Sequence, residues 1–299
     1  MNLYPVSFAH VSTGERIAYR KSGSAEKVII LIHGNMSSSV HMHAIMEVLA
    51  KDFTVYAPDL RGLGESTYNA PFDSLHELAL DVAAFADEVG IQSFQVLGWS
   101  TGGGVALELA AELPGRVENV ILLGSVPVTG YPIFKKDATG NPILTEPYKD
   151  KAELAADPVQ VLPLLNAYAT GDRAFVRGLF DMAIYNVKQP SPDEYELLLD
   201  ATMKQKSLVD IDYALLTFNM TDKDTPHSRG TGRLGKIQCP IIMLQGAKDA
   251  IVPLEWTKQS LQDMAGKATL HVFDNSGHSI ITDEPEAFIA QLRKAVGLQ

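Results

Sequence analysis

Short apolar runs alternate with amphipathic segments along most of this 299-residue chain, and that alternation restricts the fold more than any other feature. Residues 28–32 form a continuous β-branched run, which is typical of a strand buried on both faces. The clearest amphipathic segment begins at Ser74, with Glu77 three residues later as in a helix-capping box. Further strand-like runs occupy residues 53–57, 94–97, 120–123, 241–244 and 268–273. We therefore expect a mostly parallel sheet with helices on both faces. Residues 3–20 alternate apolar and polar side chains around a turn at 12–15, which predicts an N-terminal hairpin.

The alternation stops between residues 126 and 230, where no strong strand signal remains. This stretch holds 10 of the 21 Phe and Tyr residues, and we interpret it as a helical cap inserted over one edge of the sheet. The core domain then comprises residues 1–125 and 231–299. The alternative is a separate bundle of structural helices. Helices are expected at residues 151–157, 172–187, 192–206 and 208–220.

The charge balance argues against some classes of partner. Lys and Arg number 25 against 36 Asp and Glu, a formal charge of -11 that disfavours nucleic acid and anionic membranes. No apolar run approaches the roughly 20 residues of a membrane span, and the N-terminus lacks the pattern of a signal peptide. A cytoplasmic location is the default expectation. The single cysteine, Cys239, precludes an internal disulfide and is expected to be a buried structural thiol.

A G-x-S-x-G motif occupies residues 98–102 and centres on Ser100. It directly follows a predicted strand and directly precedes a helical pattern, which is the context that makes such a motif informative. A serine held in a sharp strand-to-helix turn needs neighbours that are nearly free of side chain, and Gly98 and Gly102 meet that need. The motif therefore predicts that Ser100 is a catalytic nucleophile.

A serine hydroxyl needs a base, and the base needs a carboxylate that orients it. His278 follows the last predicted strand, so it should lie at the same edge of the sheet as Ser100. Asp249 follows the strand at 241–244 and lies 29 residues before His278, which leaves room for one helix and one strand. Asp274 is nearer in sequence but lies at the strand end itself, so Asp249 is the preferred third member of the triad.

Two backbone donors are needed to stabilise the oxyanion of an acyl-transfer reaction. We expect one from the N–H of Thr101, next to the nucleophile, and one from the N–H of Asn35, after the turn at residues 33–34. The direction of the Asn35 side chain is left open. Trp99 and Met36 neighbour these groups and are expected to line the substrate pocket.

The segment at residues 41–43 contains two histidines, which raises the question of a metal site. No carboxylate or cysteine lies nearby at ligand spacing, and the HExxH pattern is missing from the sequence. We interpret the segment as the solvated start of a helix, and we predict no metal.

Over nearly its whole length the chain resembles the α/β-hydrolase family. The matching segments follow the family's order at residues 33–34, 59–66, 98–102, 246–253 and 277–278. The resemblance implies an α/β-hydrolase fold, with an eight-stranded, mostly parallel sheet and an inserted helical cap. It also implies that Asp59 and Arg61 are architectural residues that brace the turn after the second parallel strand.

Departures from the family pattern reduce the number of reactions that the chain is expected to catalyse. Members that dehalogenate or open epoxides use an aspartate nucleophile, whereas position 100 is a serine. Asn35 is like that of dehalogenases, but Thr101 stands where those enzymes place a tryptophan. The chain is also similar to bacterial hydrolases described as intracellular polyhydroxyalkanoate depolymerases, through residues 98–100 and 129–132.

These residues together predict a serine carboxylic-ester hydrolase that works through an acyl-enzyme. The expected partner is a small to medium hydrophobic ester, hydroxyalkanoate esters included, and no cofactor is expected. Lactonase, amidase, C–C hydrolase and cofactor-free perhydrolase activities stay open because they use the same triad. A non-catalytic ligand-binding protein on the same scaffold is a third hypothesis. The sequence indicates neither the natural substrate nor the oligomeric state.

Overall fold

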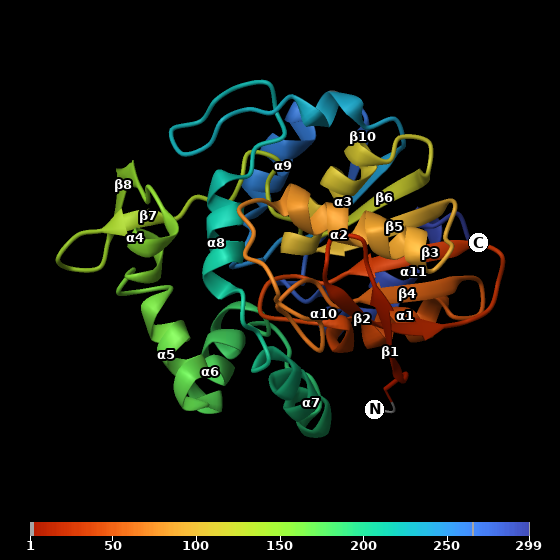
Figure 1. Cartoon of the computed structure of the whole chain (residues 1–299), viewed down its shortest axis with the longest axis horizontal. Helices are drawn as coiled ribbons and strands as arrows, with labels where there is room; N and C mark the ends of the chain where they lie inside the picture. The colour runs from red at the N-terminus through yellow and green to blue at the C-terminus, as the bar shows by residue number, and fades with distance from the viewer. Residues whose placement is uncertain (1–2, 265, 299) are drawn as a thin grey trace.

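The computed structural model describes residues 3–264 and 266–298 and is built around one large sheet. The order of its eight strands is β1-β2-β4-β3-β5-β6-β9-β10 (Figure 1). Their bounds are β1 Val6–His10, β2 Arg16–Ser22, β3 Val28–Ile32, β4 Thr54–Pro58, β5 Phe94–Trp99, β6 Val117–Leu123, β9 Ile241–Gly246 and β10 Ala268–Phe273. The pairs β1–β2 and β2–β4 are antiparallel, and all pairs from β4 to β10 are parallel. The expected eight-stranded, mostly parallel sheet and the N-terminal hairpin are confirmed.

Alternate residues of the central strands enter two separate hydrophobic clusters, one on each face of the sheet. Ile30 and Val96 point to the face covered by α2 and α3, which lie in front of the strands in Figure 1. Ile29 and Leu97 point to the opposite face, which is covered by α1 and α11. The helix bounds in this core are α1 His43–Leu49, α2 Leu75–Glu88, α3 Thr101–Glu112, α9 Leu254–Asp263, α10 Ile280–Asp283 and α11 Pro285–Ala295, with 3₁₀ turns η1 Ser39–Met42 and η2 Arg233–Lys236. Burial on both faces explains why these strands read as continuous apolar runs.

Helix α2 begins where the capping pattern predicted. The hydroxyl of Ser74 accepts from the N–H of Glu77 at 3.3 Å, so one free donor of the first turn is satisfied. The Glu77 carboxylate reaches back to the N–H of Asp73 at 2.8 Å, one residue earlier than in a standard capping box. The N-terminus of the helix is therefore fixed by its own side chains.

The segment between β6 and β9 is mixed rather than purely helical, which corrects the sequence prediction. It contains the helices α4 Lys151–Ala155, α5 Leu162–Thr170, α6 Arg173–Ala183, α7 Pro192–Thr202 and α8 Leu208–Thr217, and the hairpin β7 Phe134–Lys136 with β8 Pro142–Pro147. The hairpin strands are short and none of their residues is fully buried, so they carry no apolar periodicity. Helix α5 was not among the expected helices, and Pro163 lies in its first turn. Proline is tolerated in the first turn, where its missing N–H has no helical partner.

This inserted segment, residues 126–230, has a hydrophobic cluster of its own. Leu154, Val176 and Tyr195 are fully buried within it, and Val40 is the one buried member contributed by the rest of the described chain. Figure 1 shows α8 between the strands of the large sheet and the group formed by β7, β8 and α4, with α6 and α7 below the sheet. Among the described residues, no helix combines the length and apolarity needed to cross a bilayer. Cys239 lies partly buried against the core, and burial raises the pKa of its thiol.

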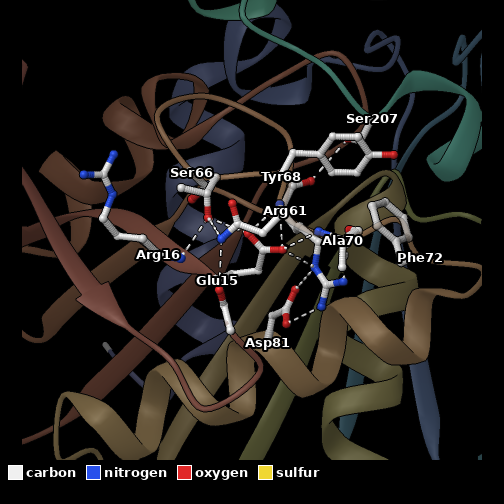
Figure 2. Close-up of polar contacts among 12 residues, drawn as sticks. Glu15, Arg16, Arg61, Ser66, Tyr68, Ala70, Phe72, Asp81 and Ser207 are labelled. Carbon is white, nitrogen blue, oxygen red and sulfur yellow. Dashed lines mark hydrogen bonds and ion pairs between the residues drawn. The ribbon is translucent and has the colours of Figure 1, made fainter.

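A buried ion-pair network fixes the loop after β4. The guanidinium of Arg61 donates to both carboxylate oxygens of Asp81, at 2.8 and 2.7 Å, and the carboxylate of Glu15 lies 3.7 Å away (Figure 2). Glu15 in turn accepts from the N–H of Ala70 at 3.1 Å. The hydroxyl of Ser207, from the inserted segment, donates to the Arg61 carbonyl at 3.2 Å. The network is architectural, as the resemblance implied for Arg61.

Removal of the cation should destabilise the fold strongly. Arg61→Met leaves Glu15 and Asp81 buried without a counter-charge, and we expect the free energy of unfolding to fall by about 3–5 kcal/mol. The matched control is Lys258→Met. Lys258 is half exposed and, within the described part of the chain, pairs with exposed Glu255 alone, so its loss should cost less than about 1 kcal/mol. Urea titration followed by circular dichroism measures both. Equal losses in the two variants would contradict the assignment.

Candidate active site

Ser100 lies in a strained turn between β5 and α3. Its backbone has φ 55° and ψ -121°, a conformation that residues other than glycine rarely adopt. The chain can turn this tightly because a Cβ on Gly98 would lie 2.1 Å from the Gly102 carbonyl oxygen, and one on Gly102 would lie 2.3 Å from that of Ile32. A Cβ on Gly34 would lie 2.9 Å from the Ser100 Cβ. The glycines of the motif are therefore required by space, and the strain is typical of a functional site.

The structure brings Asp249 and His278 together from the loops that follow β9 and β10. The Nδ1 atom of His278 lies 2.8 Å from Oδ2 of Asp249, and both side chains are buried. The same carboxylate accepts from Gln245 at 3.0 Å and from the N–H groups of Ile251 and Val252 at 2.8 Å each. These donors hold the carboxylate as an acceptor, so Nδ1–H donates to it and Nε2 carries the lone pair. The alternative, Asp274, is exposed to solvent.

Ser100 and His278 line one cavity of about 380 Å³ beneath the inserted segment. Within the described chain, no hydrogen bond links the Ser100 hydroxyl to the imidazole; in ligand-free enzymes such contacts are often long and tighten on substrate binding. The predicted pocket residues Trp99 and Met36 both line the cavity. Most of its wall is apolar, including Val126, Ile133, Val161, Leu164, Leu179, Phe180, Ile184, Leu208 and Leu215.

Asn35 and Thr101 also line the cavity that holds Ser100. The N–H of Asn35 donates to no described residue. Thr101 is the first residue of α3, where an N–H has no carbonyl partner in the preceding turn. The Asn35 side chain, whose direction the sequence left open, is held by the inserted segment: its amide donates to Asp212 at 3.0 Å.

Trp99 supports the histidine loop. Its indole N–H donates to the His278 carbonyl at 3.2 Å, and the two rings lie 5.5 Å apart. His41 also stacks on the indole, with ring centroids 6.2 Å apart, and burial lowers the pKa of His41 to about 3, so this histidine is neutral at physiological pH. The expectation that residues 41–43 are solvated was wrong, since His43 is also buried, against Tyr4. The sequence pattern around His41 gives no sign of this packing, because Trp99 lies 58 positions further along the chain.

The sheet, the strained serine after β5 and the paired aspartate and histidine define an α/β-hydrolase-type protein. The chain belongs to the alpha/beta hydrolase family, whose model matches residues 29–291. The resemblance found in the sequence is thereby confirmed.

Individual relatives differ in their activities. The chain is 38% identical to a dihydrolipoyllysine-residue acetyltransferase component of the acetoin cleaving system of Cupriavidus necator, over 40% of this chain and 32% of that one. It is 25% identical to a pimeloyl-(acyl-carrier protein) methyl ester esterase of Nitrosomonas europaea, covering 88% and 92% of the two chains. It is 26% identical to a 2-hydroxymuconate semialdehyde hydrolase of Pseudomonas sp., covering 90% and 86%.

Among solved structures, an esterase of Exiguobacterium antarcticum superimposes with a TM-score of 0.73 at 22% identity, covering 97% of this chain and 98% of the other. At this identity the likeness concerns the fold.

A methyl group at position 102 should disrupt the turn. Gly102→Ala places a Cβ against backbone oxygens that cannot move aside, and we expect a loss of more than about 3 kcal/mol in the free energy of unfolding. Gly178→Ala is the matched control, because Gly178 is exposed within α6 and its Cβ would meet nothing within 4 Å. That change should stabilise the protein by about 0.8–1 kcal/mol. Chemical denaturation of both variants tests the assignment, and a tolerated alanine at 102 would refute it.

Proposed function

We propose that the protein is a serine carboxylic-ester hydrolase in which Ser100, His278 and Asp249 form the catalytic triad. Nε2 of His278 takes the proton of the Ser100 hydroxyl as that oxygen attacks the ester carbonyl. The tetrahedral intermediate collapses, the alcohol leaves with a proton from His278, and an acyl-enzyme remains. Water, deprotonated by the same imidazole, then releases the carboxylic acid.

The observation that carries this proposal is the Asp249–His278 hydrogen bond of 2.8 Å at the cavity that holds the strained Ser100. Asp249 fixes the tautomer in which Nε2 is the base and stabilises the imidazolium that forms after proton transfer. Its further hydrogen bonds from Gln245 and two backbone amides keep the carboxylate from rotating away. The pair is therefore oriented before any substrate arrives.

The oxyanion is stabilised by the N–H groups of Asn35 and Thr101. Support comes from their position at the cavity that holds the serine, and from the Asn35 N–H that no described residue uses. The N-terminus of α3 adds a favourable dipole for negative charge at Ser100. These groups are fixed in advance, so they need little reorganisation as charge develops.

The cavity supports small to medium hydrophobic esters as substrates, hydroxyalkanoate esters among them. Its volume of about 380 Å³ and its apolar wall suit an acyl or alcohol group of a few carbon atoms. Residues 126–230 act as a cap in this proposal, since the wall includes Ile133, Leu164 and Leu208 from that segment. Specificity would then depend mainly on the cap.

One alternative has specific support. The Pseudomonas relative is named as a 2-hydroxymuconate semialdehyde hydrolase, and its similarity covers most of both chains, so hydrolysis of a C–C bond by the same triad is the second candidate. A lactonase, amidase or perhydrolase would use the same residues. A non-catalytic binding protein would have no need of the strained serine.

Replacement of the nucleophile tests the proposal directly. We expect Ser100→Ala to lower kcat for p-nitrophenyl butyrate by at least about 10³-fold, because the residual rate comes from binding and oxyanion stabilisation alone. Ser93→Ala, at an exposed serine one residue before β5, should leave kcat unchanged. Mass spectrometry of the wild-type protein with a fluorophosphonate should show one adduct on Ser100. Unchanged hydrolysis by Ser100→Ala would eliminate the assignment.

A substrate panel separates the ester hydrolase from its alternatives. The wild type should hydrolyse butyrate esters faster than the matching anilide, butyrolactone or a vinylogous 1,5-diketone. A larger kcat/KM for the diketone would establish the C–C hydrolase instead. Binding of these compounds without turnover of any of them would favour the non-catalytic protein.

A further inference from the structure

Three side chains of the inserted segment hold the Asn35–Met36 peptide. The hydroxyl of Thr202 donates to the Met36 carbonyl at 2.8 Å, and the Gln205 amide donates to Asn35 Oδ1 at 2.8 Å. The Asn35 amide donates to Asp212 Oδ1 at 3.0 Å. Thr202, Gln205 and Asp212 are all buried. We call these three residues the cap clamp.

The peptide that the clamp holds is strained. Met36 has φ 54°, a left-handed conformation that is costly for a side chain of its kind. Local bonds run from the Met36 N–H to Asn35 Oδ1, at 2.9 Å, and across the turn from the Ser37 hydroxyl to the Gly34 carbonyl, at 2.7 Å. A turn of this kind persists when surrounding groups over-determine it. In this turn, the clamp donates hydrogen bonds to the Met36 carbonyl oxygen and to Asn35 Oδ1, and it accepts one from the Asn35 side-chain NH₂ group.

The clamp itself is fixed on its far side. The Tyr168 hydroxyl donates to Gln205 Oε1 at 3.1 Å. Asp212 lies on α8, two residues from Asp210, which accepts from the Tyr68 hydroxyl at 2.5 Å and from the Phe72 N–H at 3.0 Å. Helix α8 is thus bonded to the loop that follows β4 and also to Asn35. A clamp mounted in this way can set the position of the Asn35 peptide.

We propose that Thr202, Gln205 and Asp212 are positioning residues that set the Asn35 N–H for oxyanion stabilisation, so that the rate of catalysis depends on the docked cap. This inference rests on the proposed function for its kinetic consequence. An oxyanion-hole donor contributes about 10²–10³ in kcat, and a displacement of about 1 Å can cost a large part of that. Loss of the clamp should therefore lower kcat with little change in KM.

Asp212 also makes the clamp sensitive to pH. Burial raises the pKa of its carboxyl to about 7, opposed by the Asn35 hydrogen bond and assisted by Asp157. Among the described residues, Tyr131 and Tyr168 also interact with this carboxyl, whose charge helps to raise the pKa of both phenols. Below this pKa the carboxyl is neutral; above it, a negative charge stands beside Asn35 and opposes the developing oxyanion. The ratio of kcat for the wild type to kcat for Asp212→Asn should therefore decline as pH rises through about 7.

The experiment compares variants that break the clamp with variants that preserve it. Thr202→Val and Asp212→Leu each remove one bond to the Asn35–Met36 peptide and should lower kcat about tenfold or more, with KM within about twofold. Asp212→Asn keeps the acceptor oxygen for Asn35, so it should retain most of kcat below pH 7 and lose less of it than the wild type above pH 7. Thr217→Val is the control, because Thr217 makes a similar helix bond, to the Tyr213 carbonyl, outside the clamp.

Two further readouts separate positioning from simple structural damage. The affinity for a trifluoromethyl ketone, which mimics the tetrahedral intermediate, should fall in Thr202→Val by the same factor as kcat/KM. The backbone ¹⁵N resonance of Asn35 should shift in Thr202→Val and not in Thr217→Val, and this readout needs no activity. A rise in KM at constant kcat, or an unmoved Asn35 resonance, would overturn the inference. If Ser100→Ala loses activity but the Asn35 resonance does not shift in Thr202→Val, the proposed function holds and the inference about the clamp fails.

Discussion

The close approach of backbone to backbone around Ser100 is the constraint on which the rest of the site depends. Strand β5, helix α3 and the loop after β3 approach one another so closely that positions 98 and 102 have no room for a side chain. This contact lifts the serine out of the sheet with φ 55°, a conformation stable only because the surrounding sheet and helix leave no other. The packing of α3 on one face of the sheet is thus both part of the core and the cause of the serine's exposure to the cavity.

The parallel sheet then supplies the remaining groups, because loops that follow neighbouring parallel strands emerge at the same edge. Strand β3 leads to Asn35, β9 to Asp249 and β10 to His278, and the strand order places β5 between β3 and the rest. A Cβ on Gly124, at the end of β6, would lie 3.3 Å from both Asp249 Oδ2 and His278 Nδ1, so even the intervening strand end must stay bare. The strand order therefore determines both the fold and the positions of the site residues.

Much of this arrangement could be predicted from the sequence because its causes are local. The glycines around Ser100, the apolar strands and the capping residues Ser74 and Glu77 all act within a few positions. The position of Asp249 and His278 after predicted strands was enough to place them at one edge. The features that were not predicted lack a local signal. Strands β7 and β8 have no apolar periodicity, and His41 packs against a tryptophan far along the chain. The clamp joins Asn35 to Asp212, 177 positions apart, and no spacing rule connects such residues.

The attachment of the inserted segment explains why specificity and catalysis need not be independent here. On one side, α8 and the residues before it are bonded to the loop that Arg61, Glu15 and Asp81 make rigid. On the other side, the same segment bonds the strained Asn35–Met36 turn and lines the cavity. A substitution that reshapes the pocket through α8 therefore also shifts the support of the Asn35 peptide. Altered substrate preference should then come with altered kcat for changes close to Asp212, whereas changes in α6, which lines the cavity without bonding Asn35, should affect preference alone.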